Sequence, residues 1–408
     1  MFMMPFQILG MWLRGLLSLA LIGGGIWLLV LWNGERTGPL IDPPRVADPE
    51  APAQREEWRP GLNRGTLYLA GGALLLLWSA GGGLLVSRWL ASGRPGDEPQ
   101  DVPGGVSHDI PRPDGSRLHV EVYGHPDNPP LILTHGWGLD GASWCYAKQE
   151  LARGRRLIVW DLPGLGRSTS PTGRDWSLEK LAGHLAAVLE LAGDKPAILA
   201  GQSIGGMITL TFCKLYPELL GTKVAGLALI HTTHTNPVKT ASLAPLYTAI
   251  QKPVLEPLCW LMVALAPFVW LMNALTWLRG SAHRSVESAC FSGKESGGQL
   301  EFMTRYFLQD WPATIARGYL AMFRYDATGV LPVINVPTLV VAGDKDSMCV
   351  PAASKFMADT IPGARLAVLS PAAHAGHVER HADFARHLGE FATQVQGTGA
   401  AKREPQPA

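Results

Sequence analysis

Two long apolar segments in the first ninety residues constrain this chain more than any other feature. Residues 15–32 and 66–87 form runs of 18 and 22 residues without a charged side chain. A helix needs about 20 apolar residues to cross roughly 30 Å of hydrocarbon. A cleaved signal peptide is the alternative for the first run, but no small-residue cleavage site follows it closely. We therefore predict two transmembrane helices in a membrane region that covers residues 1–91.

The charge balance and the cysteines exclude several classes of protein. The 408 residues include 35 basic and 34 acidic side chains, so the formal net charge is +1. Near-neutral charge without a long Lys/Arg run gives no electrostatic basis for nucleic-acid binding. None of the five cysteines forms a Cys-x-x-Cys pair. A disulfide framework is therefore not expected, and the pattern favours a reducing compartment.

The membrane orientation depends on two signals that point in opposite directions. The proline-rich segment 33–65, an extended loop by composition, contains five arginines. On the other side, the amino terminus, Arg14, Arg88 and Arg94 give four positive groups, so the positive-inside rule slightly favours a cytoplasmic loop. The unpaired cysteines instead favour a cytoplasmic large domain. We follow the cysteines and predict a two-span protein of a bacterial-type inner membrane with that domain in the cytoplasm.

After a Gly/Pro/Asp-rich linker at 92–104, residues 105–395 have the pattern of an α/β domain. Short apolar runs alternate with helical stretches such as 178–191, which is typical of a parallel sheet covered on both faces. Residues 396–408 are polar and small, and we expect a disordered tail. The predicted strands lie at 118–124, 131–134, 157–160, 197–200, 227–230, 338–342 and 366–369.

A Gly-x-Ser-x-Gly motif lies between a predicted strand and the helical run 207–215. It reads Gly201-Gln202-Ser203-Ile204-Gly205. A serine on so tight a turn has its hydroxyl above the sheet and a helix N-terminus beneath it. The motif predicts that Ser203 is a nucleophile, with a structural serine in a glycine-rich turn as the alternative.

A serine nucleophile needs a base that is itself oriented by an acid. Asp346, beyond the strand at 338–342, is the predicted acid, with Asp344 as its rival. His377, after the last strand, is the predicted base. Three other histidines, at 374, 381 and 387, compete with it. Their spacing is also compatible with a metal cluster, but a base is already required here, so we expect no metal.

The loop after the strand at 131–134 is the predicted source of the oxyanion hole. It contains His135, Gly136, Trp137 and Gly138, and its glycines allow a close approach to the serine. The backbone amides of Trp137 and Ile204 are the predicted donors. We expect His135 to brace the loop through hydrogen bonds. The segment 161–168 ends another strand, and we expect a structural turn there.

Together these motifs resemble the α/β-hydrolase fold superfamily over residues 105–393. In chain order they are His-Gly-Trp-Gly, Asp-Leu-Pro-Gly-Leu-Gly-Arg-Ser, Gly-Gln-Ser-Ile-Gly-Gly and the Asp346/His377 pair. The resemblance implies a mostly parallel sheet with helices on both faces and a serine hydrolase triad. Gly138 departs from the proline of many members, and a serine nucleophile disfavours epoxide and haloalkane chemistry.

The family inserts a cap before the acid, which would be residues 231–328 here. Residues 258–278 within it carry no charge. A single membrane crossing there would separate Ser203 from Asp346, and Pro267 favours two short helices. A buried helix pair and a hairpin that enters the leaflet both remain open.

The predicted function is that of a membrane-anchored serine esterase or lipase. Its substrate would be a lipophilic ester or lipid, and no cofactor is implied. Acyl transfer, thioester hydrolysis or C–C bond hydrolysis with the same triad is the first alternative. A non-catalytic membrane scaffold is the second.

Overall fold

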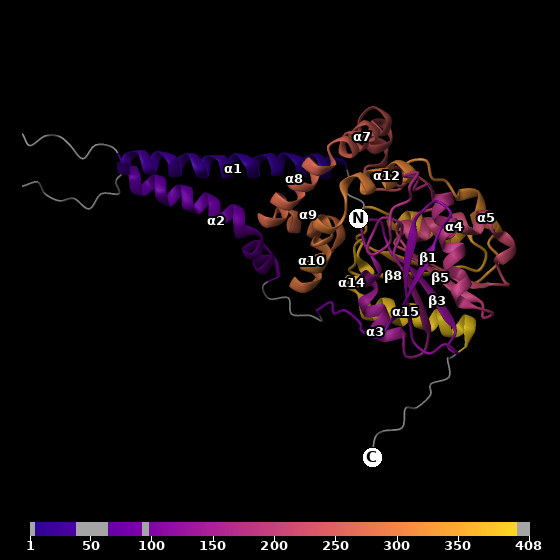
Figure 1. The fold of residues 1–408 in the computed structure, drawn as a ribbon. Helices are drawn as coiled ribbons and strands as arrows, with labels where there is room; N and C mark the ends of the chain where they lie inside the picture. Colours follow the sequence, from indigo (N-terminus) through magenta and orange to yellow (C-terminus); the bar gives the residue numbers. More distant parts are fainter. Residues whose placement is uncertain (1–4, 38–63, 92–97, 398–408) are drawn as a thin grey trace, which may run out of the picture.

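The computed structural model describes residues 5–37, 64–91 and 98–397. Two long helices, α1 (Pro5–Thr37) and α2 (Arg64–Ala91), project from one side of an α/β domain and pack against each other (Figure 1). Their backbones meet closely at two glycines, because a Cβ on Gly72 would lie 2.9 Å from the carbonyl oxygen of Gly25. The helices therefore form a hairpin.

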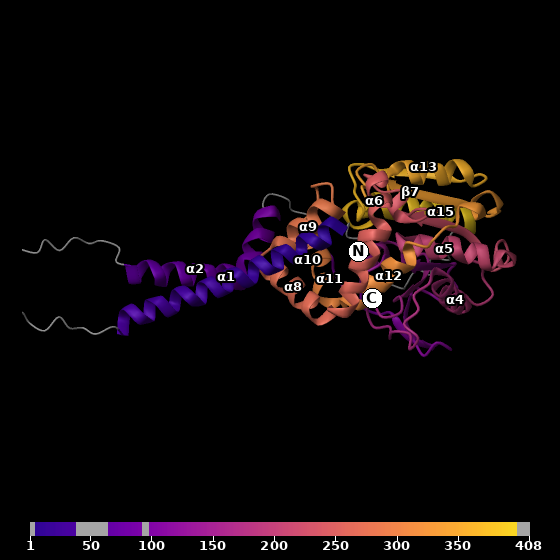
Figure 2. The same cartoon turned by 90° about the horizontal axis from the view of Figure 1, so that it is seen from above.

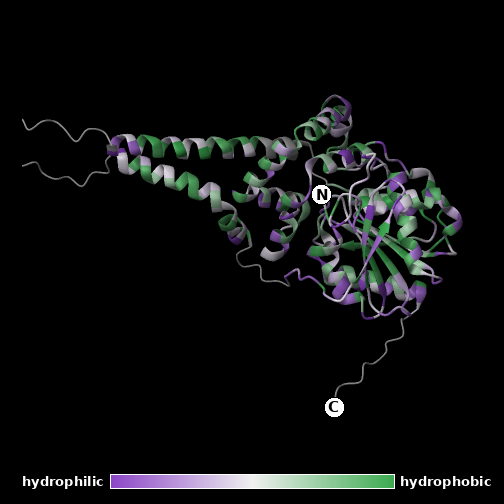
Figure 3. Ribbon diagram, viewed as in Figure 1, coloured by the Kyte–Doolittle hydropathy of each residue, from purple (hydrophilic) through white to green (hydrophobic). Residues whose placement is uncertain are grey.

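Both helices are long and apolar enough to cross a membrane. The candidate spans are Leu13–Arg36 and Arg64–Leu90, and they contain the two predicted segments. Only 17% and 22% of the residues in their most apolar windows are buried in the protein. Figure 3 shows apolar residues along most of both helices. The prediction of an extended loop at 33–65 is wrong at its ends, because residues 33–37 continue α1 and residues 64–65 begin α2. Residues 38–63 of that segment, the linker residues 92–97 and the tail from residue 398 lie outside the described residues.

An eight-stranded sheet forms the centre of the α/β domain. Its spatial order is β1-β2-β4-β3-β5-β6-β7-β8, with β2 antiparallel to β1 and β4 and all other pairs parallel. The strands are β1 (Val106–Pro111), β2 (Arg117–Tyr123), β3 (Pro130–Thr134), β4 (Arg156–Trp160), β5 (Ala197–Gln202), β6 (Val224–Ile230), β7 (Thr338–Gly343) and β8 (Arg365–Leu369). The sequence did not predict β1, because its edge position leaves it exposed and without an apolar pattern.

Helices cover both faces of the sheet, as the apolar runs predict. One face packs against α3 (Cys145–Leu151) and α15 (His381–Gln396). The other packs against α4 (Leu178–Leu189), α5 (Ile204–Leu215) and α13 (Pro351–Thr360). The short helix α14 (Gly376–Glu379) follows β8 and precedes α15. This layered architecture confirms the predicted fold class.

A helical cap is inserted between β6 and β7, and it lies between the sheet and the two long helices (Figure 2). Helices α7 and α8 meet at a bend of 95°, as the proline at 267 predicts. The cap helices are α6 (Ala244–Ile250), α7 (Glu256–Ala264), α8 (Ala266–Leu278), α9 (Ser281–Cys290), α10 (Gly297–Thr304), α11 (Tyr306–Gln309) and α12 (Pro312–Met322).

Candidate active site

Ser203 occupies a strained turn between β5 and α5. Its φ of +55° and ψ of −119° are rare for a residue with a side chain. The neighbouring glycines make this turn possible. A Cβ on Gly201 would lie 2.2 Å from the carbonyl carbon of Gly205, and a Cβ on Gly205 would lie 2.3 Å from the carbonyl oxygen of Thr134. The predicted elbow is therefore present, and only glycine fits at these two positions.

The imidazole in contact with Ser203 belongs to His374. Its Nε2 lies 3.1 Å from Ser203 Oγ, and its Nδ1 lies 2.9 Å from Asp346 Oδ2. If Nδ1–H donates to the carboxylate, Nε2 is left to accept the hydroxyl proton. His374 lies in the loop between β8 and α14, where the chain passes the carboxyl edge of the sheet. The three side chains thus form one hydrogen-bonded chain.

The prediction that His377 contacts Ser203 is wrong. His377 lies in the helical turn α14, and its ring packs against Trp144 at 5.1 Å and Phe384 at 6.2 Å between centroids. Within the described part of the chain, neither of its ring nitrogens has a hydrogen-bond partner. Burial lowers the pKa of His377 well below its ordinary value, so the ring is neutral. The helix directs this side chain into an apolar layer, whereas the preceding loop brings His374 to the serine.

Asp346 is held as an ionised acceptor. Its Oδ1 accepts hydrogen bonds of 2.9 Å from the amides of Met348 and Cys349. Burial alone would raise the pKa of Asp346, but the hydrogen-bonded His374 and the nearby His231 outweigh burial and lower this pKa below its usual range. The carboxylate therefore stays charged and can orient an imidazole.

The rival acid, Asp344, has a structural position. It accepts hydrogen bonds from the amide of Ala372 at 2.9 Å and from the hydroxyl of Ser370 at 2.8 Å. These contacts fix the loop that leads to His374. The structure therefore brings Asp346, and not Asp344, to the imidazole.

Two buried residues beside the triad escaped the sequence analysis. His231 is fully buried, and its Nδ1 lies 3.6 Å from Asp346 Oδ2. It directly follows β6, so its place at the carboxyl edge of the sheet was an available signal. Glu379 accepts hydrogen bonds from the amide of Ala373 at 3.2 Å and from the amide of Ser292 at 2.9 Å. Glu379 thus joins the histidine loop to the cap, and no local pattern in the sequence reveals this contact.

The predicted oxyanion loop lies directly against the serine turn. A Cβ on Gly136 would lie 2.1 Å from Gln202 Oε1 and 3.4 Å from Ser203 Cβ. Gly138 has a φ of +73°, which suits glycine. Ile204 is the first residue of α5, so its amide has no acceptor within the helix. The amides of Trp137 and Ile204 thus belong to segments that flank Ser203.

His135 braces this loop, as expected. Its Nδ1 lies 2.8 Å from the carbonyl oxygen of Gly136, and its Nε2 lies 2.9 Å from the amide of Leu162. Burial lowers the pKa of His135, which favours a neutral ring that donates at Nδ1 and accepts at Nε2. The turn at 161–168 has the expected structural role, because Asp161 accepts from the amides of Gly141 at 2.7 Å and Arg167 at 2.8 Å.

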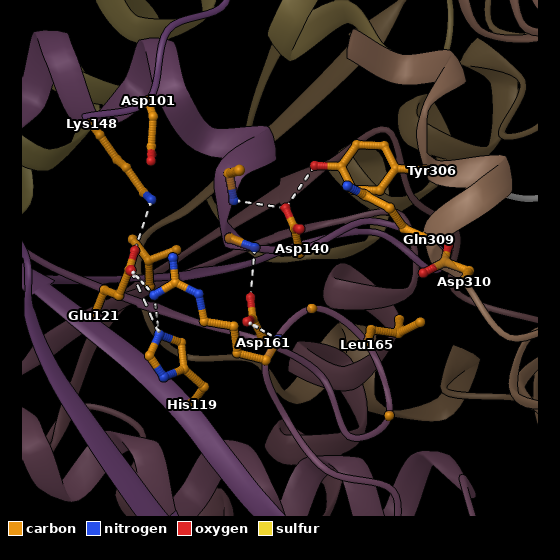
Figure 4. Close-up of a pocket in the computed structure, with 16 residues that line it drawn as sticks. Asp101, His119, Glu121, Asp140, Lys148, Asp161, Leu165, Tyr306, Gln309 and Asp310 are labelled. Atoms are coloured by element: carbon orange, nitrogen blue, oxygen red, sulfur yellow. Dashed lines mark hydrogen bonds and ion pairs between the residues drawn. The ribbon is translucent and has the colours of Figure 1, made fainter. Parts of the chain in front are cut away.

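A polar pocket of about 370 Å³ lies beside this turn, and the cap is fastened there. Figure 4 shows Tyr306, from cap helix α11, pointing toward Asp140. The phenol donates a hydrogen bond of 2.6 Å to Asp140 Oδ1, which also accepts from the amide of Ala142. Burial and the neighbouring carboxylate raise the pKa of Tyr306 well above its ordinary value, so the phenol stays a donor.

The cavity beside Ser203 is very small. Its volume is about 10 Å³, the room of one water molecule at most. Cys290 of α9 and Met303 of α10 form its cap wall, so a substrate needs a displacement of these helices. The lining residues are Gly136, Trp137, Leu139, Gln202, Ser203, Cys290, Met303, His374, Ala375 and His377.

Comparison with known proteins agrees with the fold described above. A model of the alpha/beta hydrolase fold matches residues 129–251. A protein named "Putative carbamate hydrolase RutD" from Stutzerimonas stutzeri is 27% identical over 295 residues, which cover 68% of this chain and 99% of that protein. A pimeloyl-[acyl-carrier protein] methyl ester esterase from Aeromonas salmonicida is 28% identical over 281 residues, which cover 67% of this chain and 98% of that protein.

A solved structure extends over more of the chain. The crystal structure of a bacterial membrane phospholipase A superposes with a TM-score of 0.56 at 22% identity. The match covers 81% of this chain and 96% of that protein. At this level of identity the likeness shows the shared fold.

Proposed function

Because the chain belongs to the α/β-hydrolase superfamily, we propose that it is a membrane-anchored serine hydrolase that cleaves lipophilic carboxylic esters. The observation that carries this proposal is the hydrogen-bonded chain from Ser203 through His374 to Asp346. A relative named as a methyl ester esterase supports the ester as the scissile group.

The first half of the reaction forms an acyl-enzyme. Ser203 Oγ attacks the ester carbonyl while His374 Nε2 accepts the hydroxyl proton. The ionised Asp346 stabilises the imidazolium, and the amides of Trp137 and Ile204 donate to the oxyanion. When the tetrahedral intermediate collapses, the C–O bond to the alcohol breaks and His374 gives its proton to the leaving oxygen.

The second half regenerates the serine. A water molecule attacks the acyl carbonyl, and His374 Nε2 accepts one of its protons. The same two amides hold the second oxyanion. Collapse breaks the bond to Ser203 Oγ, which takes the proton back from His374, and the carboxylic acid leaves.

The preference for a lipophilic substrate rests on the cap and the spans. Leu139, Cys290 and Met303 give the cavity an apolar wall. The two candidate spans would hold the domain at a bilayer surface. All five cysteines are free and buried, which supports our proposal that this domain faces the cytoplasm. A reporter fused to the carboxyl terminus tests the orientation: cytoplasmic activity is expected, and periplasmic activity would reverse it.

Fluorophosphonate labelling of the full chain in detergent tests the serine mechanism. We expect the wild type to react and Ser203→Ala not to react. Equal labelling of both proteins, or of neither, contradicts the proposal. A panel of esters, thioesters and ring-cleavage products then separates ester hydrolysis from the other reactions open to this triad. A protein that neither labels nor turns over any of them favours the non-catalytic scaffold.

A further inference from the structure

The outer side of cap helices α7 and α8 is an exposed apolar surface. Residues 257–278 contain no Asp, Glu, Lys or Arg. Water-soluble proteins seldom leave a large contiguous surface of this kind uncovered. Six large side chains on these helices and at their junction are 40–55% exposed. We call this set the apolar cap face: Trp260, Leu261, Leu265, Phe268, Trp270 and Leu271.

Helix α8, which carries part of this face, packs directly on the two candidate spans. Helix α8 lies against α1 and α2 (Figures 1 and 2). A Cβ on Gly15 of α1 would lie 2.7 Å from Met272 Sδ. A Cβ on Gly83 of α2 would lie 2.4 Å from the carbonyl oxygen of Trp277. Gly83 therefore admits the end of α8 to backbone distance, and Gly15 leaves room for the side chain of Met272.

A polar network fixes the same contact. Arg279, directly after α8, donates hydrogen bonds to Ser18 Oγ at 2.9 Å and to the carbonyl oxygen of Arg14 at 3.2 Å. Arg14 in turn donates to Ser285 Oγ of α9 at 2.9 Å. These bonds hold the cap at one level of the hairpin.

That level corresponds to a shallow depth in a bilayer. Arg14 and Arg88 mark the domain-side ends of the two uncharged runs. Ser18 lies four residues beyond Arg14, or about 6 Å along the helix axis. Gly83 lies five residues from Arg88, or about 8 Å. Amphipathic helices at a membrane surface bury their apolar faces by about 5–10 Å, so the cap meets the spans at the depth that such helices occupy.

We propose that the apolar cap face is a membrane-docking surface, embedded in the leaflet that holds the domain-side ends of α1 and α2. The partner is lipid acyl chains, because such chains surround the spans α1 and α2 at the depth where the cap packs on them. The indoles of Trp260 and Trp270 suit the boundary between acyl chains and headgroups. Trp270 Nε1 already donates to the carbonyl oxygen of Leu308 at 3.0 Å, so its polar atom is satisfied without water.

The docking surface is continuous with the wall of the catalytic cavity. Helices α9 and α10 follow α8, and they supply Cys290 and Met303 to that wall. The cap side of the cavity is therefore built from α9 and α10, of which α9 packs on α8 and both pack on the spans. It follows that the substrate is drawn from the leaflet: an ester whose acyl chain is long enough to reside in a bilayer. This consequence rests on the function proposed above.

Depth-dependent quenching tests the docking surface without any use of activity. The five native cysteines are buried, so a thiol-reactive fluorophore attaches to an introduced cysteine. Phe268→Cys reports the cap face, and Leu366→Cys, on β8, is a control of matched exposure, 41% against 40%. Leu17→Cys, on the first span, is the positive reference. The full chain is placed in phosphatidylcholine nanodiscs that contain lipid with a nitroxide on acyl carbon 5.

We expect quenching at position 268 to approach that at position 17 and to exceed that at position 366 several-fold. Equal quenching at 268 and 366 would overturn the proposal. Disulfide formation between two unlabelled Phe268→Cys chains, with weak quenching of the labelled protein, would also overturn it, because a second copy would then cover the face.

The consequence for the substrate has its own measurement. Phe268→Ser/Leu271→Ser is compared with the wild type on a long-chain ester in vesicles and on a short soluble ester. We expect at least a tenfold loss on the vesicle substrate and an unchanged rate on the soluble one. If the variant matches the wild type on the vesicle substrate as well as on the soluble one, entry of the substrate from the leaflet is overturned. If the wild type turns over neither ester, the proposed function fails, while the quenching result still decides the docking surface.

Discussion

Replacement of His374 by alanine separates the two histidines that the sequence offers as bases. His374 Nε2 is the only imidazole nitrogen with a hydrogen bond to Ser203 among the residues that the structure describes. Without it the hydroxyl has no base, and Asp346 has nothing to orient. Loss of the base from a complete triad lowers kcat by about a million-fold, which corresponds to roughly 8 kcal/mol of transition-state stabilisation.

The matched variant is His377→Phe. Its ring can keep the packing against Trp144 and Phe384, and it removes no hydrogen bond within the described chain. We expect a change in kcat of less than tenfold. Phenylalanine is preferred to alanine, because alanine would open a cavity in this layer and cost about 3 kcal/mol of stability.

Both variants are assayed with a soluble p-nitrophenyl ester and by fluorophosphonate labelling. Thermal unfolding in detergent shows that each remains folded. Added imidazole is expected to restore part of the activity of His374→Ala and to leave His377→Phe unchanged. The reasoning is refuted if His377→Phe loses as much activity as His374→Ala, or if His374→Ala keeps its activity.

Three further changes test the loop, the cap and the buried histidine. Gly136→Ala places a Cβ 2.1 Å from Gln202 Oε1 and must displace the oxyanion loop, so steady-state assays should find kcat about 100-fold lower. Tyr306→Phe removes the hydrogen bond to Asp140, which is worth about 1 kcal/mol; if cap opening limits access, fluorophosphonate labelling should be about fivefold faster. In the folded protein the pKa of His377 lies below its ordinary value of 6.5. As the pH falls, His377 therefore binds a proton in the unfolded chain before it does so in the folded protein, and the stability decreases below about pH 6.5. Denaturant unfolding of His377→Phe should therefore show a shallower loss of stability, by up to about 1.4 kcal/mol per pH unit.

The parts of the fold that the sequence predicts are those set by local pattern. The apolar runs at 131–134 and 197–200 have no polar position to place at a surface, so they predict strands buried on both faces. The glycines around Ser203 predict a turn that other residues do not fit. The two uncharged segments near the amino terminus predict helices through their length alone.

The choice between His374 and His377 depends on geometry that local pattern does not contain. The two residues are three positions apart, and both follow β8. The helical turn that begins at Gly376 directs the second ring toward Trp144, and the loop before it brings the first ring to the serine.

Hydrogen bonds on both sides of His374, the proposed base, connect the loop that carries it to the cap. The amide of Ala375, next to His374, donates a hydrogen bond of 2.8 Å to the carbonyl oxygen of Cys290 at the end of α9. Glu379 joins Ala373, on the other side of His374, to Ser292 of the cap. The imidazole therefore lies between two attachments to the cap. Because Cys290 also closes the cavity, a displacement of α9 that admits a substrate must strain or release the loop that carries the base. An open cap with a disordered base would be inactive, so productive opening has to keep at least one of these two attachments.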